Sequence, residues 1–337
     1  MAYPVMATGK EWFAPNVSTV KRSTITKVDF VKDYTPSGSE TDVWDASAAK
    51  DGSVMVYVNG TEVIVSAEGS EKIQTNADSS YVFGVVSEDY FLNLEQINGL
   101  NLLDTSQTTT MRGMFQCCVK VKELDVGGFD MRNVDSVMNM FMSLTSKYDP
   151  MSIEHIYGTE KWKFEKTVDL KGFVRGCESL KGINLAGWHV VASDMTATFD
   201  ECENIQELDL SGIDNTNATG DGALYGLLRL ERLKISNAYK FETGRPNDPS
   251  SEYIEGADGK WHTIHGDSFT SADLPGNINL TYYATAEAAE ADLAKLKQTF
   301  VLVDGYTAVG VADAIREKTG TYGDLTPSEW ASAIRNI

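Results

Sequence analysis

The 337-residue chain lacks the features that mark several large classes of protein. No stretch approaches the roughly 18 consecutive apolar residues that a membrane-spanning helix needs, so we expect no membrane insertion. The beginning of the chain contains no apolar stretch of signal-peptide length, and its end contains no hydrophobic anchor tail. We therefore expect a protein that is made and folded inside a cell without an export signal.

Positive charge is scarce, because 29 Lys and Arg residues face 49 Asp and Glu residues, and the formal net charge is −20. This balance argues against nucleic acid or an anionic membrane as the partner, since both attract surfaces rich in Lys and Arg. Hydrophobic residues make up 42% of the chain and aromatic residues 10%, which is enough for a soluble protein with a substantial core.

Familiar catalytic motifs are missing as well. The chain contains no G-x-S-x-G, H-E-x-x-H or P-loop motif, and no glycine-rich dinucleotide motif in its strand context. Carboxylates are plentiful, but this is expected in a chain so acidic, and a glycosidase pair is defined by spatial separation rather than by sequence. We therefore expect a protein that is not an enzyme and that needs no cofactor or metal.

Cysteine and histidine are rare, with four residues of each. Cys118, Cys177 and Cys202 recur at one position of a repeated pattern, so each is expected to be a small buried apolar side chain. A zinc site needs closely spaced pairs of ligands, whereas these cysteines are a full repeat apart. A disulfide ladder is the remaining alternative. His262 and His265 have no third ligand in helical spacing, which favours surface or turn positions over a metal site.

What the chain does contain is a repeated motif. "CESLKGINLAGW" begins at Cys177, "CENIQELDLSGI" begins 25 residues later at Cys202, and "LLRLERLKISNA" begins at Leu227 after the same interval. Another copy begins at Cys118, and a degenerate, lengthened copy begins at Ser143. The shared pattern is C-x-x-φ-x-x-φ-x-φ, where φ is Leu, Ile or Val. A fixed period in the twenties is typical of leucine-rich-repeat solenoids.

The repeat predicts an α/β solenoid, a leucine-rich-repeat coil of parallel strands and short helical turns, flanked by small β units and a C-terminal helical segment. Each φ-x-φ pair indicates a short strand with one buried face. The apolar clusters at residues 111–115, 137–141 and 195–199 have the spacing of a helical turn. Stacked units would close a common core. The core positions expected in the strands and just after them are Leu124, Val126, Ile183, Leu185, Leu208, Leu210, Leu233 and Ile235, and then Leu103, Phe129, Trp188 and Ile213.

The solenoid is expected over residues 90–240, and the composition changes on both sides of it. The flanking parts are an N-terminal attachment segment at 1–24, a β-rich N-terminal cap domain at 25–89, a small β unit at 241–284 and a C-terminal helical module at 285–337. In the cap domain, Asn59-Gly60 indicates a hairpin and Tyr81 begins a further strand. In the helical module, Thr285 is expected to cap the first of three helices.

The residue between the two φ positions must point outward, because side chains alternate along a strand. An insertion at residues 146–167 lies in the middle of the repeats, and insertions often map to a binding face. The candidate binding residues are therefore Asp125, Asn184, Asp209 and Lys234 on the strands, and Tyr157 and Trp162 in the insertion. The alternative is a solvated sheet face with an insertion folded onto its own unit, because few interface residues carry binding energy.

Two units, "LDVGGFDMRNVDSVMNMF" from Leu124 and "LDLSGIDNTNATGDGALY" from Leu208, resemble the repeat of BspA-like leucine-rich-repeat proteins. The "MF-x-x-C-x-x-L-x-x-L-x-L" core of that family matches at Phe115 and Cys118, whereas Phe173 departs from it by one residue. The segment "DGKWHTIHGDSFTSADLPGNINLTYYA" is similar to the stretch that often follows such repeats. The resemblance covers most of residues 25–284.

The two ends carry a second, shorter resemblance. "EWFAPNVSTVKRSTITKVDF" and "GVADAIREKTGTYGDLTPSEWASAIRNI" resemble segments of tail and minor structural proteins of phages that infect Gram-positive bacteria. The resemblance implies a virion component that is assembled in the host cytoplasm, which agrees with the expected absence of an export signal.

Together these observations favour a non-enzymatic phage structural protein of the tail, baseplate or fibre that presents its repeat surface for host attachment. The expected partners are other virion proteins, through the N- or C-terminal segment, and a host surface protein or glycan. We also expect a homo-oligomer in the particle, and no nucleic acid partner. The alternative is a bacterial BspA-like surface adhesin that binds a host or matrix protein.

Overall fold

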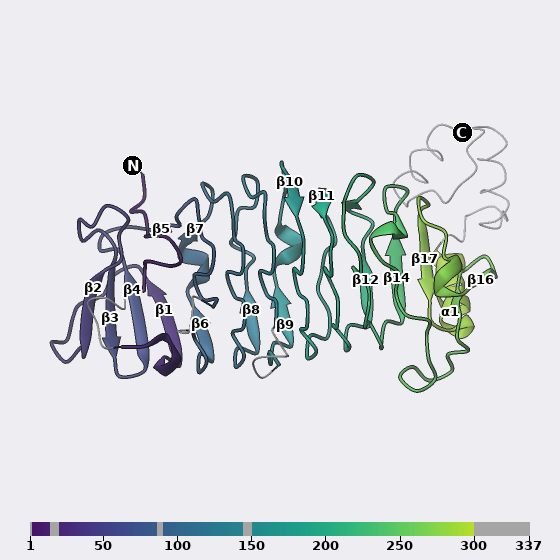
Figure 1. Ribbon diagram of the computed structural model, residues 1–337, viewed down its shortest axis with the longest axis horizontal. Coiled ribbons are helices and arrows are strands. Elements are labelled where there is room, and N and C mark those ends of the chain that lie inside the picture. The colour runs from purple at the N-terminus through teal and green to yellow at the C-terminus, as the bar shows by residue number, and fades with distance from the viewer. Residues whose placement is uncertain (1, 14–19, 86–89, 144–149, 300–337) are drawn as a thin grey trace.

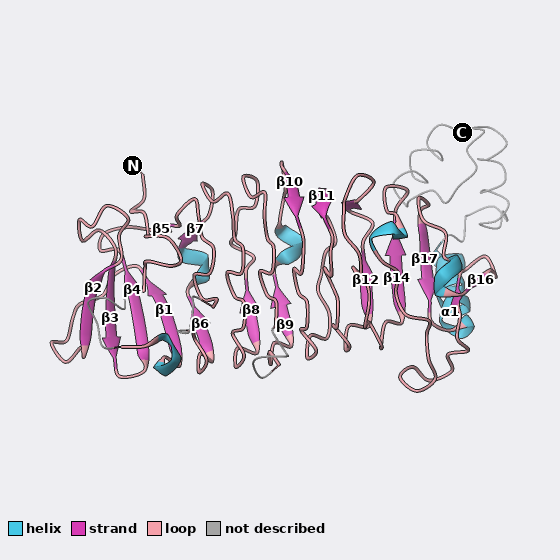
Figure 2. Ribbon diagram, viewed as in Figure 1, coloured by secondary structure: helices cyan, strands magenta, loops and turns pink. Residues whose placement is uncertain are grey.

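The computed structural model describes residues 2–13, 20–85, 90–143 and 150–299. This part of the protein is elongated, and its short strands lie side by side across the long axis (Figure 1). Loops and turns make up most of the chain between the strands, as Figure 2 shows. The described 3-10 helices have three residues each and are Arg22–Thr24, Leu100–Leu102, Thr159–Lys161, Phe241–Thr243 and Ser271–Asp273.

A five-stranded sheet forms one end of the molecule, in the order β2-β3-β4-β1-β6. Its strands are β1 (Lys27–Val31), β2 (Asp42–Asp45), β3 (Met55–Asn59), β4 (Glu62–Ser66) and β6 (Gln96–Asn98). β3 and β4 form the predicted antiparallel hairpin, with Gly60 at a φ of +62° in its turn. Alternate residues of β1, β3 and β4 are buried, which places one face of this sheet against the core.

The predicted strand that begins at Tyr81 is wrong, because residues 81–84 form turns and bends. Tyr81 has a φ of +62°, which lies outside the β region. The N–H groups of Tyr81 and Phe83 donate to the carbonyls of Arg112 and Met114, at 2.9 and 2.8 Å. This segment therefore follows the path of the neighbouring turn instead of forming a strand.

Part of the predicted attachment segment, 1–24, is packed into the core. Trp12 and Phe13 are buried, and the indole N–H of Trp12 donates to the Val82 carbonyl at 2.8 Å. Arg22 is buried too, where its Nη2 donates to the Gly9 carbonyl at 3.0 Å and its guanidinium lies 5.2 Å from the centre of the Phe91 ring. The indole N–H of Trp44 on β2 donates to the Trp12 carbonyl at 2.8 Å, which ties the segment to the N-terminal sheet.

The apolar positions of the sequence repeat are buried as predicted. All twelve of the predicted core residues, from Leu103 to Ile235, are at most 7% exposed. Successive units pair locally through parallel strands: β8 (Glu123–Asp125) pairs with β9 (His155–Tyr157), and β12 (Glu207–Asp209) pairs with β14 (Arg232–Ile235). The alternation of φ and polar residues therefore predicted the direction of these side chains correctly.

Cys118, Cys177 and Cys202 are buried and form no disulfide, in agreement with the prediction. The Sγ atoms of Cys177 and Cys202 lie 3.0 Å from the carbonyl oxygens of Phe141 and Val174, to which their thiols donate. The thiol of Cys118 donates to Phe83 O at 3.4 Å in the same way. Burial raises the pKa of each of these three thiols, so all three are neutral at physiological pH.

Aromatic rings connect the N-terminal sheet to the first repeat units. The rings of Phe83, Phe115 and Phe141 are stacked in a row, with centroids 5.4 Å apart at both steps and interplanar angles of 9° and 2°. All three side chains are buried. Stacked rings of this geometry contribute beyond the burial of their surface.

The predicted helical turns are wrong. The backbone of residues 111–117 forms a zigzag instead. In this zigzag every second residue donates its N–H to a carbonyl of the next unit, 25 residues further on, at 2.8–3.0 Å; these residues are Met111, Gly113, Phe115 and Cys117. Gly113 and Cys117 have positive φ values of 58° and 59°, which a right-handed helical turn excludes. Apolar residues four apart meet on one side of this zigzag as they would on a helix, which is why the spacing was misleading.

The predicted fold class, an α/β leucine-rich-repeat solenoid, is also wrong. The described strands form five separate sheets, of five, three, five, two and two strands, and no single parallel sheet runs through the repeats. The two largest sheets mix parallel with antiparallel pairs. The described part of the chain has one α-helix, α1 (Ala286–Thr299), so the α component is nearly missing. The fold is a series of small sheets, two of them mixed and three parallel, joined by turns.

The three remaining sheets of the described residues are small. Their strands are β5 (Ile73–Gln74) with β7 (Leu103–Asp104), β10 (Thr167–Asp169) with β11 (Val190–Asp194) and β13 (Ile213–Asp214), and the pair of β8 with β9 described above. All the strand pairs in these sheets are parallel.

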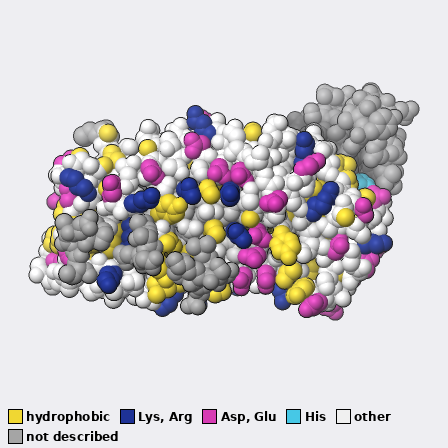
Figure 3. Space-filling model, viewed as in Figure 1, with side chains coloured by type: hydrophobic (Ala, Val, Ile, Leu, Met, Phe, Trp, Pro, Cys, Tyr) yellow, Lys and Arg dark blue, Asp and Glu magenta, His cyan; other side chains and the backbone are white. Residues whose placement is uncertain are grey.

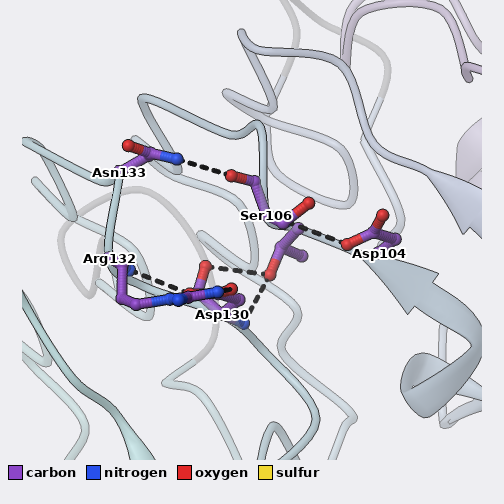
Figure 4. A network of polar contacts seen from close by, with 6 residues as sticks. Asp104, Ser106, Asp130, Arg132 and Asn133 are labelled. Carbon is purple, nitrogen blue, oxygen red and sulfur yellow. Dashed lines mark hydrogen bonds and ion pairs between the residues drawn. The ribbon is translucent and has the colours of Figure 1, made fainter. Parts of the chain in front are cut away.

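Polar side chains link neighbouring units. The side chain of Asn133 donates to the Ser106 carbonyl at 2.7 Å (Figure 4). The buried Thr105 hydroxyl donates to the Asp130 carbonyl at 3.1 Å and accepts from the Asp130 N–H at 2.6 Å. Equivalent links join Thr159 to Asn184 and Asn215 to Lys240. Because these polar groups are satisfied, their burial does not destabilise the fold.

The far end of the described chain is a mixed sheet covered by α1. β14 pairs antiparallel with β17 (Leu280–Tyr283), followed by β15 (Trp261–His262) and β16 (Ser268–Phe269). The Thr285 hydroxyl accepts from the N–H of Ala288 at 3.1 Å, which confirms the predicted N-cap. The two further helices predicted in residues 300–337 lie outside the described residues. No helix that the structure describes is long and apolar enough to span a bilayer.

Candidate functional site

The outward-facing residues of the strands form a polar face. Parallel pairing places Asp125 beside Tyr157, and Asp209 beside Lys234. The bridge between Ile156 and Ile183 brings the segment that holds Asn184 to the other side of Tyr157. The structure therefore brings the predicted binding residues together as two groups, Asp125 with Tyr157 and Asn184, and Asp209 with Lys234.

Asp209 and Lys234 form an ion pair on this face. Lys234 Nζ lies 2.8 Å from Asp209 Oδ2, with the side chains 41% and 29% exposed. Burial raises the pKa of Asp209, but hydrogen bonds from Lys234 and Ser211 outweigh it, so the net pKa lies below the ordinary value. The Asp209 carboxylate is consequently ionised at neutral pH and paired with the Lys234 side chain.

Three of the predicted binding residues also stabilise the turn that follows them through a side-chain hydrogen bond. One carboxylate or amide oxygen of Asp125, Asn184 and Asp209 accepts from the N–H two residues later, at 2.9–3.0 Å. This is an Asx turn, which ends each strand. Repetition of Asp or Asn at this position therefore has a structural cause.

The two aromatic candidates, Tyr157 and Trp162, differ clearly in solvent exposure. Tyr157 is 48% exposed, stacks on His155 with ring centroids 5.6 Å apart, and places its hydroxyl 3.5 Å from Glu123 Oε1. Partial loss of solvent and the neighbouring Glu123 carboxylate raise the pKa of Tyr157. Trp162 is fully buried and donates to the Val126 carbonyl at 3.0 Å, so it packs in the core and does not reach the surface.

A groove runs between β6 and β8, beside the polar face. It encloses ≈ 810 Å³, and its walls include Gln96, Asn98, Lys120, Lys122, Glu123 and Glu154. We call it the β6–β8 groove. A second depression of ≈ 480 Å³ continues along Ile97 and Asn98 to Asp125 and Lys161. The sequence prediction missed this groove, although Ile97 precedes Leu124 by nearly one repeat length and marks β6 as a further strand of the row.

The charges around the groove are mixed. Lys120 Nζ contacts Asn93 Oδ1 at 2.6 Å, and Lys181 forms an ion pair with Glu154 at the rim. The hydrogen bond from Lys181 is the main reason that the pKa of Glu154 lies below its ordinary value. Figure 3 shows the same interspersion of acidic and basic side chains along the visible surface of the molecule.

Metal ligation finds no support in the part of the chain that the structure describes. No group of three or more His, Cys, Asp or Glu side chains converges there in a way that could hold an ion. His262 contacts Asp258 at 3.0 Å, and this hydrogen bond holds the pKa of Asp258 below its usual range. His262 thus lies in β15, is paired with Asp258 and has a side chain only 13% exposed, so the predicted surface or turn position is wrong for this residue.

Comparison with known proteins gives one match. A family model described as "Mycoplasma protein of unknown function, DUF285" matches residues 85–153, the stretch that contains β6, β8 and the repeat unit at Cys118. The match gives weak support to the resemblance to BspA-like repeat proteins and provides no link to phages. No curated protein and no solved structure matches the chain significantly.

Proposed function

We propose that this protein is a non-enzymatic component of a phage virion, in the tail, baseplate or fibre, that attaches the particle to a host cell through its polar face. The observation that carries the binding function is the β6–β8 groove, which opens on the face where Asp125 and Tyr157 lie side by side. A groove of ≈ 810 Å³ has the size of a ligand-binding depression.

The support for a virion comes from the ends of the chain, which resemble segments of phage tail proteins. In this proposal the N- or C-terminal segment contacts other virion proteins, and the particle contains several copies of the chain. The alternative is a bacterial BspA-like surface adhesin that binds a host or matrix protein. It is favoured by the family-model match at residues 85–153.

The two candidates differ in where the protein is found. Mass spectrometry of gradient-purified phage particles induced from the source strain should detect the chain at a fixed ratio to the major tail protein. Detection on the surface of uninfected cells, and not in particles, would support the adhesin instead.

Binding itself is tested with the full-length protein, labelled and incubated with Gram-positive cells and with purified cell walls. We expect saturable retention and recovery of the ligand without chemical change. Release of soluble cell-wall fragments at a rate above that of the untreated wall would contradict the non-enzymatic proposal. A Tyr157→Ala variant is expected to bind less well, and Val43→Ala, which alters an exposed residue far from the groove on β2, serves as the control.

A further inference from the structure

We infer that the β6–β8 groove receives an extended segment of a partner protein, which adds a strand along the free edge of β8. The inference rests on the proposed binding function and names the class of partner, a protein chain in an extended conformation. Its basis is the interruption of the sheets at this point, because β6 ends one sheet and β8 begins another.

The hydrogen bonds of β8 show which main-chain groups are free. The Lys122 carbonyl accepts from Glu154 N at 2.8 Å, and Val126 N donates to the Tyr157 carbonyl at 2.9 Å, so these groups face β9. Main-chain groups of a strand alternate between its two sides. Those of Glu123 and Asp125 therefore face β6.

The opposite wall of the groove is a strand edge as well. β6 pairs with β1 on one side, through Gln96, Ile97 and Asn98. On its other side, no backbone hydrogen bond joins β6 to β8 within the residues that the structure describes. Two unpaired strand edges thus border the groove, and unpaired edges are the surfaces to which extended segments of other chains add.

Both ends of the unpaired stretch are closed. At one end the hydrogen bond between Lys120 and Asn93 spans the two walls. At the other end the walls meet, since a Cβ atom on Gly128 would lie 3.1 Å from the Cα of Asn101. The open length corresponds to the three residues of β8, or roughly 10 Å of extended chain. A short contact of this length suits a peptide strand.

The chemistry of the walls favours recognition of the main chain. The groove and its continuation carry the carboxylates of Glu95, Glu123, Glu154 and Asp125, and the ammonium groups of Lys120, Lys122 and Lys161. These charges nearly cancel, so neither an acidic nor a basic ligand is strongly selected. Tyr157, the exposed aromatic ring on which a sugar could stack, does not line the groove. Peptide therefore fits better than glycan.

The test uses full-length protein and a displayed library of linear ten-residue peptides, with a glycan array as the second arm. We expect selected peptides to bind, and to lose binding when alternate peptide amides are N-methylated. Binding should change little between 50 and 500 mM salt, because the charges of the groove are balanced. Hydrogen exchange of the segment that contains Glu123 and Asp125 should be rapid in the free protein and slower in the complex.

Matched variants locate the contact. Glu123→Pro removes one of the free N–H groups, and Gln96→Trp fills the groove from an exposed position; each should weaken peptide binding about tenfold or more. The controls are Glu207→Pro, at the corresponding position of β12, and Gln206→Trp, at an exposed glutamine just before β12. β12 pairs with β14 in the same way, and neither residue lines this groove. These should bind peptide as the unaltered protein does. Gln96→Trp keeps the test valid where Glu123→Pro fails to fold.

The inference is overturned when no peptide is selected, when glycans bind and peptides do not, or when Gln96→Trp binds peptide unchanged. Its failure differs from failure of the proposed function. Cell binding that persists in Gln96→Trp would leave attachment intact and exclude the groove, whereas peptide binding without any cell binding would support the groove and contradict host attachment.

Discussion

The ammonium group of Lys234 lies 2.8 Å from Oδ2 of Asp209, and the two residues, 25 positions apart, sit directly opposite each other on the parallel strands β14 and β12. Each repeat unit thus provides one partner. The outward-facing side chain of Asp209, which the sequence suggests is available for binding, already forms an ion pair with the side chain at the same position of the next unit, Lys234.

Removal of this ion pair should destabilise the protein slightly. Lys234→Met is expected to lower the free energy of unfolding at pH 7 by about 0.5 kcal/mol, because both side chains are partly exposed. The pKa of Asp209 is lowered on folding. Its contribution is therefore present above the unfolded-state value of about 3.9 and is lost as pH falls through the folded-state pKa. Urea unfolding at pH 7 and pH 2.5 measures both effects, and a difference that grows toward pH 2.5 would contradict the assignment. Lys32→Met, at a more exposed ion pair with Glu71, should have a smaller effect.

The cysteines should be unreactive in the native protein. All four are buried and none forms a disulfide, and burial raises the pKa of Cys118, Cys177 and Cys202. Since the thiolate is the reactive form, we expect no labelling by a thiol reagent at pH 8 within minutes, and four equivalents in denaturant. Rapid native labelling at any of these three positions would show that the repeats open more readily than their packing indicates.

Two glycines should respond differently to a methyl group. A Cβ atom at Gly212 would lie 2.0 Å from the Trp188 carbonyl oxygen, whereas a Cβ atom at Gly182 would meet nothing within 4 Å. Gly212→Ala should therefore lower the free energy of unfolding by about 1–3 kcal/mol. Gly182→Ala should change it by no more than about 1 kcal/mol, with a stabilising sign where the backbone allows it. Equal effects in denaturant unfolding would contradict the close approach of the chain at Gly212.

Substitution of the two aromatic candidates of the insertion should have different effects: Trp162→Ala should lower stability, and Tyr157→Ala should weaken binding. Trp162→Ala removes a fully buried ring and its hydrogen bond to Val126, and we expect a loss of about 3–5 kcal/mol. Tyr157→Ala alters a half-exposed ring and should change stability by less than about 0.5 kcal/mol while it weakens attachment. Thermal unfolding and cell binding, measured on both variants, test the distinction. A stable Trp162→Ala variant with impaired binding would reverse the two roles.

Local features were predictable because they depend on near neighbours. Asn59-Gly60 specifies a hairpin turn, Thr285 specifies a helix N-terminus, and alternation of apolar and polar residues specifies which side of Leu208 or Leu233 is buried. The 25-residue period also predicted that equivalent positions such as Asp209 and Lys234 would be neighbours.

The rest depended on information that periodicity does not contain. Apolar residues four apart indicate a helical turn as well as the zigzag found at Gly113 and Cys117, and only the backbone angles distinguish them. The predicted fold class was wrong for a related reason. The segments expected to be helical turns form hydrogen bonds to the next unit instead of α-helical hydrogen bonds, and the strands divide into separate sheets. An aromatic residue in an insertion fits the surface or the core equally well, and Trp162 lies in the core.

The row of stacked rings formed by Phe83, Phe115 and Phe141 affects how cooperatively the protein unfolds. Phe115 touches a ring on either side, one contributed by the N-terminal part of the chain and one by the next unit. Loss of the Phe115 ring would interrupt the row and remove the stacking partner that Phe83 and Phe141 share. We expect such damage to uncouple the melting of the N-terminal sheet from that of the repeats, so that one sharp transition becomes two.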